Sequence, residues 1–131
     1  MKVATKGYVL AKGEESVAPA GFAPPPHVHH AEDEAFYVLE GDVTFTCGDR
    51  TWNATAGSFA FLPRDVPHQF QVSDAGPLKM LQLTLPAQFD RFAAEVGESA
   101  RANTLPAPTE PDVPKLLAAS AKYKIEIMPP R

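Results

Sequence analysis

The feature that most constrains the fold is a series of short segments between Pro24 and Leu85, interrupted at close intervals by glycine. Val43–Cys47, for example, alternates apolar and polar residues and is followed by Gly48–Asp49. This pattern predicts β-strands joined by hairpin turns, and no helical periodicity fits the region. We therefore expect an all-β sandwich or barrel of about eight antiparallel strands. The expected strands are 35–40, 43–47, 51–55, 58–62, 69–72 and 78–85, with weaker candidates at 6–10 and 17–18.

The sequence changes character after Pro86. Apolar residues recur at helical spacing between Ala87 and Gly97, and Asp112 can cap a second helix that continues to about Tyr123. We expect these helices to pack outside the barrel, or against a neighbouring subunit, and to carry no catalytic residue. The expected organisation is a single domain over residues 1–131, with a barrel at 1–86 and a helical extension at 87–131.

Composition narrows the function classes. The net charge is -4, and the acidic residues form no tail, which argues against nucleic-acid or membrane-surface binding. No window is apolar enough to span a bilayer, and the single cysteine, Cys47, excludes an internal disulfide. We expect Cys47 to be a buried, inert thiol. We therefore expect a cytoplasmic protein that binds a small molecule or another subunit.

Three of the four histidines lie between residues 27 and 30. On an extended strand, His27 and His29 leave by the same face, because strand side chains repeat every second residue. Glu34 begins the next apolar segment and could face these rings, and His68 could reach them from a later turn. Three imidazoles and one carboxylate would suit a divalent ion of iron, manganese, nickel, cobalt, copper or zinc.

If the histidine cluster is considered by itself, the alternative interpretation is a surface patch without function. His30 leaves by the opposite face, so we expect it in solvent or behind a ligand, and Glu32 and Asp33 are expected as turn residues. If Glu34 and His68 point inward, residues at the same parity line the inner wall near the metal. These expected substrate-binding residues are Phe36, Val38, Phe70 and Val72.

Two motifs make the chain resemble the cupin superfamily. The first runs Gly21, five residues, His27, one, His29, four, Glu34, six, Gly41, and the second runs Gly57, five residues, Pro63, then His68. Asp65 stands where a glycine is common and Val72 where asparagine is frequent, and neither position is a metal ligand in the family. Segments such as Phe-Tyr-Val-Leu-Glu-Gly and Leu-Pro-Arg-Asp-Val-Pro-His are similar to small bacterial quercetin 2,3-dioxygenase-like cupins.

The resemblance implies a double-stranded β-helix, or jelly-roll barrel, with His27, His29, Glu34 and His68 as metal ligands and Glu34 also as general base. It also implies a homodimer, in which the strand face of Tyr37 and Leu39 would be covered.

Three functions stay open at this point. The first is a metal-dependent oxygenase acting on a small planar enol or phenol. The second is a non-redox cyclase, isomerase or decarboxylase, and the third is a small-molecule-binding protein without catalysis.

Overall fold

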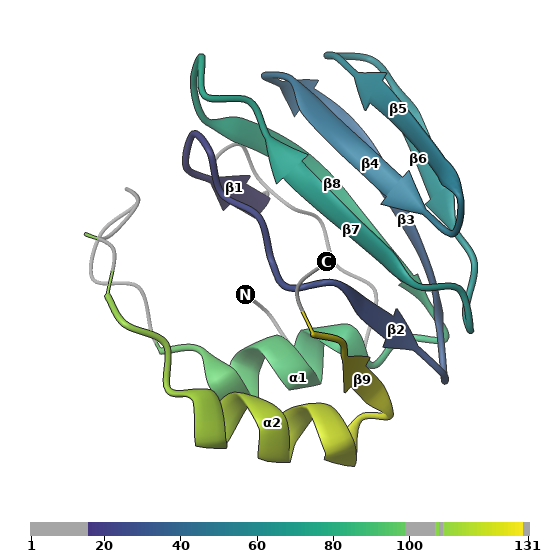
Figure 1. Cartoon of the computed structure of the whole chain (residues 1–131), viewed down its shortest axis with the longest axis vertical. Coiled ribbons are helices and arrows are strands. Elements are labelled where there is room, and N and C mark those ends of the chain that lie inside the picture. Colours follow the sequence, from purple (N-terminus) through teal and green to yellow (C-terminus); the bar gives the residue numbers. More distant parts are fainter. Residues whose placement is uncertain (1–15, 99–106, 108, 130–131) are drawn as a thin grey trace.

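The protein folds into two facing antiparallel sheets, seen in a computed structural model that describes residues 16–98, 107 and 109–129. One sheet has four strands in the order β1, β8, β3, β6, and the other has five in the order β5, β4, β7, β2, β9 (Figure 1). The predicted all-β class is therefore confirmed. The bounds are β1 Ser16–Ala18, β2 His27–His29, β3 Asp33–Glu40, β4 Val43–Cys47, β5 Arg50–Ala54, β6 Phe59–Leu62, β7 His68–Val72, β8 Leu78–Leu85 and β9 Ile125–Ile127.

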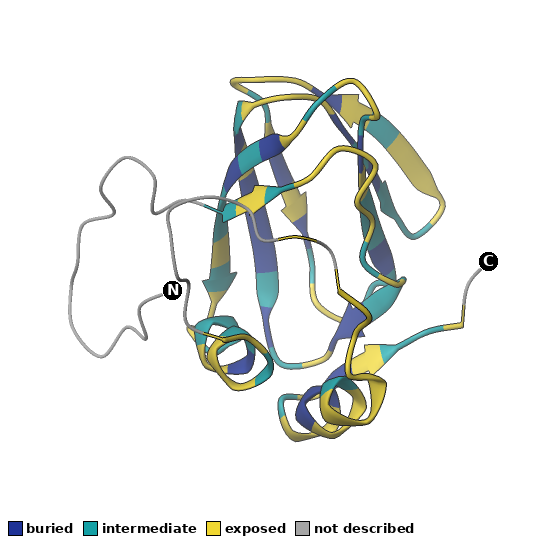
Figure 2. Cartoon of the chain, turned by 90° about the vertical axis from the view of Figure 1, so that its left-hand side faces the viewer, coloured by how far each residue is buried: buried dark blue, intermediate teal, exposed yellow. Residues whose placement is uncertain are grey.

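The hydrophobic core fills the space between the sheets. Phe45 and Val38 are fully buried there, and neighbouring aromatic rings such as Phe36 pack against the ring of Phe45 at centroid distances of 5.5 to 6.3 Å. Figure 2 shows the buried segments on the inner sides of both layers. The alternation that predicted the strands thus gives each sheet an apolar inner face.

We had predicted that the glycine-containing turns close hairpins, and for most of them this prediction is wrong. Among the turns in the described residues, only Gly48–Asp49 closes a hairpin, between the paired strands β4 and β5. The turns at Gly41 and Gly57 pass the chain from one sheet to the other, because β3 pairs with β6 and β8 whereas β4 pairs with β5 and β7. Both glycines have positive φ, and a Cβ at Gly41 would lie 2.5 Å from the carbonyl oxygen of Pro77. A tight turn that crosses between the sheets needs a glycine just as a hairpin turn does, so the sequence pattern could not distinguish the two kinds of turn.

In the described part of the chain after the barrel there are two helices, α1 at Phe89–Val96 and α2 at Val113–Lys122. Asp112 is the N-cap of α2, as predicted, and its carboxylate accepts a hydrogen bond from the backbone N–H of Lys115 at 3.0 Å. The helices pack together with β9 around Phe92 and Ile125. They lie at the end of the barrel next to β2 and β9, outside the two sheets (Figure 1).

Strand β9 lies in the segment that was expected to be a helical extension. Its three residues pair antiparallel with all three residues of β2, which would otherwise be the edge of the five-stranded sheet. The sequence prediction missed this strand because its partner is about a hundred residues away and three residues carry no period. The candidate strand at residues 6–10 lies outside the described residues.

No helix among the described residues is long and apolar enough to cross a membrane.

Candidate metal centre

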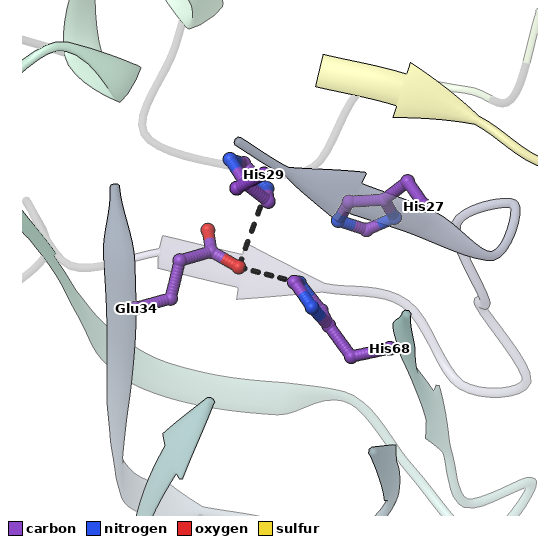
Figure 3. Close-up of side chains that lie close together, drawn as sticks. All are labelled: His27, His29, Glu34 and His68. Atoms are coloured by element: carbon purple, nitrogen blue, oxygen red, sulfur yellow. Dashed lines mark hydrogen bonds and ion pairs between the residues drawn. The ribbon is translucent and has the colours of Figure 1, made fainter. Parts of the chain in front are cut away.

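The structure brings His27, His29, Glu34 and His68 together at one point between the sheets. One ligand atom from each residue can be chosen so that all four lie within 4.8 Å of one another. The histidines come from the neighbouring strands β2 and β7, where His27 pairs with His68, and Glu34 reaches across from β3 (Figure 3). His29, Glu34 and His68 are buried and His27 is partly exposed. The predicted convergence of these side chains is therefore observed.

Each of the three rings is held through its Nδ1 atom by an oxygen that accepts a hydrogen bond. The Nδ1 atom of His27 lies 2.7 Å from the carbonyl of Pro25, and that of His68 lies 3.1 Å from the carbonyl of Val66. A carbonyl oxygen has no proton to give, so Nδ1 carries the proton and Nε2 keeps its lone pair. All three rings are thereby set to bind a cation through Nε2.

The ring of His29 is held differently, by the carboxylate of Glu32. The Nδ1 atom of His29 lies 2.7 Å from Oε1 of Glu32, and both side chains are 1% exposed. We had predicted Glu32 as a turn residue only, and the structure corrects this. The i,i+3 spacing of a carboxylate after His29 was the available signal. It was not sufficient, because the side-chain direction depends on how the chain crosses from β2 to β3.

The charge states of the site suit a divalent metal. Burial, with the neighbouring imidazole of His68, lowers the pKa of His27 from 6.5 to about 4, so the ring is neutral at neutral pH. For Glu34, burial raises the pKa, but the contact with His68 and the proximity of His29 and His27 outweigh it, and the pKa lies below its ordinary 4.5. Neutral imidazoles and an ionised carboxylate are the forms that bind metal ions.

The arrangement of lone pairs also fits a cation. Oε2 of Glu34 lies 2.7 Å from Nε2 of His68 and 3.3 Å from Nε2 of His29 (Figure 3). A bare nitrogen lone pair at such a distance from a carboxylate oxygen is repulsive unless a proton or a metal cation lies between them. Nε2 of His29 is buried and has no hydrogen-bond partner among the described residues. A metal ion coordinated by the four side chains would satisfy this atom.

Two further residues at the site were not found from the sequence. Gln82 on β8 donates a hydrogen bond from Nε2 to Oε1 of Glu34 at 2.9 Å, which leaves Oε2 facing the histidines. Phe89, the first residue of α1, packs its ring 5.6 Å from that of His29. A side chain of a helix therefore borders the site, which the sequence did not reveal, although a ring contact of this kind does not make Phe89 a catalytic residue.

The expected wall residues lie in or against the core. Phe36, Val38 and Val72 are buried members of the core cluster, and Phe70 is partly buried and packs against Phe36 at 6.0 Å. They share the inward side of β3 and β7 with Glu34 and His68. His30 points outward, as expected, and contacts Asp65 and Glu126 at the surface.

Two antiparallel sheets that enclose a buried set of three histidines and one glutamate define a β-barrel protein with a candidate metal centre. Residues 13–84 match the family model described as the cupin domain, and the chain belongs to this family. The predicted double-stranded β-helix is thus confirmed together with the resemblance.

Three similar proteins illustrate the relationship. The chain is 28% identical over 72 residues to an uncharacterized protein of Methanocaldococcus jannaschii, covering 55% of this chain and 58% of that protein. It is 26% identical over 91 residues to quercetin 2,3-dioxygenase of Bacillus subtilis, covering 70% of this chain and 27% of the dioxygenase. A solved structure from Klebsiella pneumoniae, titled as a protein with a double-stranded beta-helix domain, has a TM-score of 0.50 and 20% identity. That match covers 55% of this chain and 64% of the other, and it supports the fold alone.

Proposed function

We propose that the protein is a metal-dependent enzyme, an oxygenase of the quercetin 2,3-dioxygenase-like type that acts on a small planar enol or phenol. The observation that carries the proposal is the convergence of four ligand atoms within 4.8 Å, in a buried site beside an aromatic core. The similarity to quercetin 2,3-dioxygenase over 91 residues favours oxygenase chemistry, although it covers only 27% of that protein.

The residues of the chain take distinct roles in this proposal. His27, His29, Glu34 and His68 hold one divalent transition metal, which would act as a Lewis acid toward a substrate oxygen and, if redox-active, exchange electrons with O2 and substrate. Glu34 accepts the proton of the substrate hydroxyl, and Gln82 steadies its carboxylate through the hydrogen bond to Oε1.

The aromatic residues near the metal would exclude water and pack against a planar substrate. Phe70 is partly buried on the face of His68, and Phe89 borders His29. Phe36 lies behind Phe70, and the fully packed Val38 and Val72 support this wall from the core. A dry, apolar setting strengthens the interaction of substrate with the metal charge.

Elemental analysis followed by an oxygen-electrode assay tests the proposal. Protein purified without added metal is analysed for its bound ion and then assayed with flavonols, diketones and enols. We expect oxygen uptake that stops in the Glu34→Gln variant, with the exposed Glu40→Gln variant as matched control. Turnover that continues unchanged without oxygen would replace the oxygenase by a cyclase, isomerase or decarboxylase. Tight ligand binding without any product would indicate a non-catalytic binding protein.

We also propose that the protein is a homodimer, joined through the outer face of the four-stranded sheet. This face carries neighbouring exposed apolar side chains, among them Phe59 at 63%, Phe61 at 52% and Leu85 at 63% exposure, together with Tyr37 and Leu83. The outer face of the other sheet instead presents threonine, asparagine and glutamine on β4, β5 and β7. A large apolar face that is the same on two copies can pair about a two-fold axis.

Sedimentation velocity at micromolar concentration tests the dimer. Phe61→Glu should yield a monomer, because the pairing would bury two uncompensated charges. Gln71→Glu, on the polar outer face, adds the same charge and should leave the dimer intact. A monomeric wild-type protein would contradict the proposal.

A further inference from the structure

Glu32 is a buried carboxylate that the catalytic proposal does not use. It is 1% exposed, its Oε1 accepts a hydrogen bond from His29 at 2.7 Å, and its Oε2 is buried without a hydrogen-bond partner among the described residues. A carboxylate with one unpaired buried oxygen lowers the stability of a folded protein. The contact with His29 offers a functional reason for this cost.

The three histidines are not held equivalently. His27 and His68 donate to backbone carbonyls, which carry no net charge, whereas His29 donates to a carboxylate. A carboxylate on Nδ1 fixes the orientation of the ring and increases the basicity of Nε2. It also places a second negative charge directly behind the ligand set.

We propose that Glu32 is a positioning residue of the metal centre, which orients His29 and sets the net charge of the site. The inference rests on the proposed metal binding. A divalent ion with Glu34 as its only carboxylate would leave a charge of about +1, and the Glu32 carboxylate reduces this to about zero. A site of this charge favours a neutral hydroxyl compound over a preformed anion, which narrows the substrate class to protonated enols and phenols.

The test compares Glu32→Gln with wild-type protein, using Co2+ as a spectroscopic probe and azide as a simple anion. Glutamine keeps the shape of the side chain, removes its charge and replaces one carboxylate oxygen by an NH2 group. We expect the Kd for Co2+ to rise about 10- to 100-fold, the visible Co2+ absorption to shift, and azide to bind the Co2+ form about tenfold more tightly. Substitution of a residue that only supported the fold would not strengthen azide binding.

Asp65→Asn is the matched control. Asp65 is an exposed carboxylate that contacts His30 and has a φ of 65°, which asparagine tolerates. This variant also loses one negative charge near the site, and it should bind Co2+ and azide as wild-type protein does.

Two measurements separate the possible failures. Near-ultraviolet circular dichroism of metal-free Glu32→Gln should match that of wild-type protein. If the variant does not fold, Glu32→Asp, whose shorter carboxylate cannot reach Nδ1 of His29 in the same way, should show the same loss of Co2+ affinity. Wild-type-like Co2+ affinity and spectrum in the folded variant would overturn the role of Glu32. Failure of wild-type protein to bind Co2+ would instead overturn the proposed metal site itself.

Discussion

His68 is the ligand that completes the site from a distant part of the chain. Its Nε2 lies 2.7 Å from Oε2 of Glu34, and its ring stacks on that of His29 at 5.3 Å with an interplanar angle of 9°. We predict that His68→Ala weakens metal binding by more than the roughly 10- to 100-fold that loss of an outer hydrogen-bond partner costs. Isothermal titration calorimetry with Zn2+ measures this. His30→Ala, which alters only surface contacts, should bind as wild-type protein does, and equal affinities of both variants would contradict the assignment.

Gln82 determines which oxygen of Glu34 is available. Because its amide donates to Oε1 at 2.9 Å, Gln82→Leu would leave that buried oxygen without its donor. We predict a loss of about 1 to 3 kcal/mol in the free energy of unfolding of metal-free protein, measured in urea. Gln69→Leu is the control variant for metal binding. It also removes an amide donor, but this amide bonds to the carbonyl of Pro24 and not to Glu34. If only Gln82→Leu weakens metal binding, the amide of Gln82 has a role in the site beyond stability. Equal weakening in the two variants would refute this role.

The residues that the sequence predicted correctly are those whose direction follows from strand period and spacing. His27 and His29 share a face because they are two apart on β2, and the motif spacing located Glu34 and His68. Glu32 could not be placed in this way, because it lies in the crossing between the two sheets, where no period applies. Its direction is set by tertiary contacts that a sequence pattern does not contain.

At the scale of elements, β9 holds the strand that carries two of the ligands. All three residues of β2 pair with β9, but only His27 pairs with β7. Ile125 of β9 is buried with Phe92 and Ala119, so β9 also fastens both helices to the barrel. The sequence predicted both helices and their approximate ends but not this strand, and therefore not how the helices reach the metal site.

Ile125→Ala should loosen this attachment. Deletion of a buried isoleucine side chain costs about 2 to 5 kcal/mol, and urea unfolding measures the loss. We predict that metal affinity also falls, because β2 loses part of its support. Val113→Ala, at an exposed position of α2, should change neither quantity appreciably. A destabilised Ile125→Ala protein with unchanged metal affinity would show that β2 is positioned without β9.

The pairing of α1 with α2 should depend on pH. Glu95 of α1 lies 3.2 Å from the ammonium of Lys122 on α2, and hydrogen bonds from Tyr123 and Lys122 hold the pKa of Glu95 below its ordinary 4.5. A depressed carboxyl pKa stabilises the fold above the ordinary pKa, and this contribution disappears as the pH falls through the lowered value. We predict that Glu95→Gln has a lower urea midpoint than wild-type protein at pH 7, and that the difference vanishes at low pH. If the difference in urea midpoint persists at pH 2 to 3, it is caused by packing and not by charge.

At the scale of the whole molecule, the candidate site joins the two sheets. His27, His29 and His68 belong to the five-stranded sheet, whereas Glu34 and Gln82 belong to the four-stranded sheet. A metal ion bound by all four ligands would therefore connect both layers at the end of the barrel where the helices lie. An unfolded chain cannot hold these residues together, so the binding free energy adds to the stability of the folded state.

This geometry predicts that metal addition raises the thermal stability of the entire barrel. At a free metal concentration 100 times the Kd, the folded state gains about 2.7 kcal/mol, which corresponds to a rise in Tm of roughly 10 °C for a domain of this size. Melting curves of protein treated with a chelator and then supplied with Zn2+, Ni2+ or Co2+ measure the shift. In Glu34→Gln the rise should be much smaller, because the metal loses its anionic ligand from the four-stranded sheet. An equal rise in wild-type and Glu34→Gln protein would show that the metal binds elsewhere and does not connect the sheets.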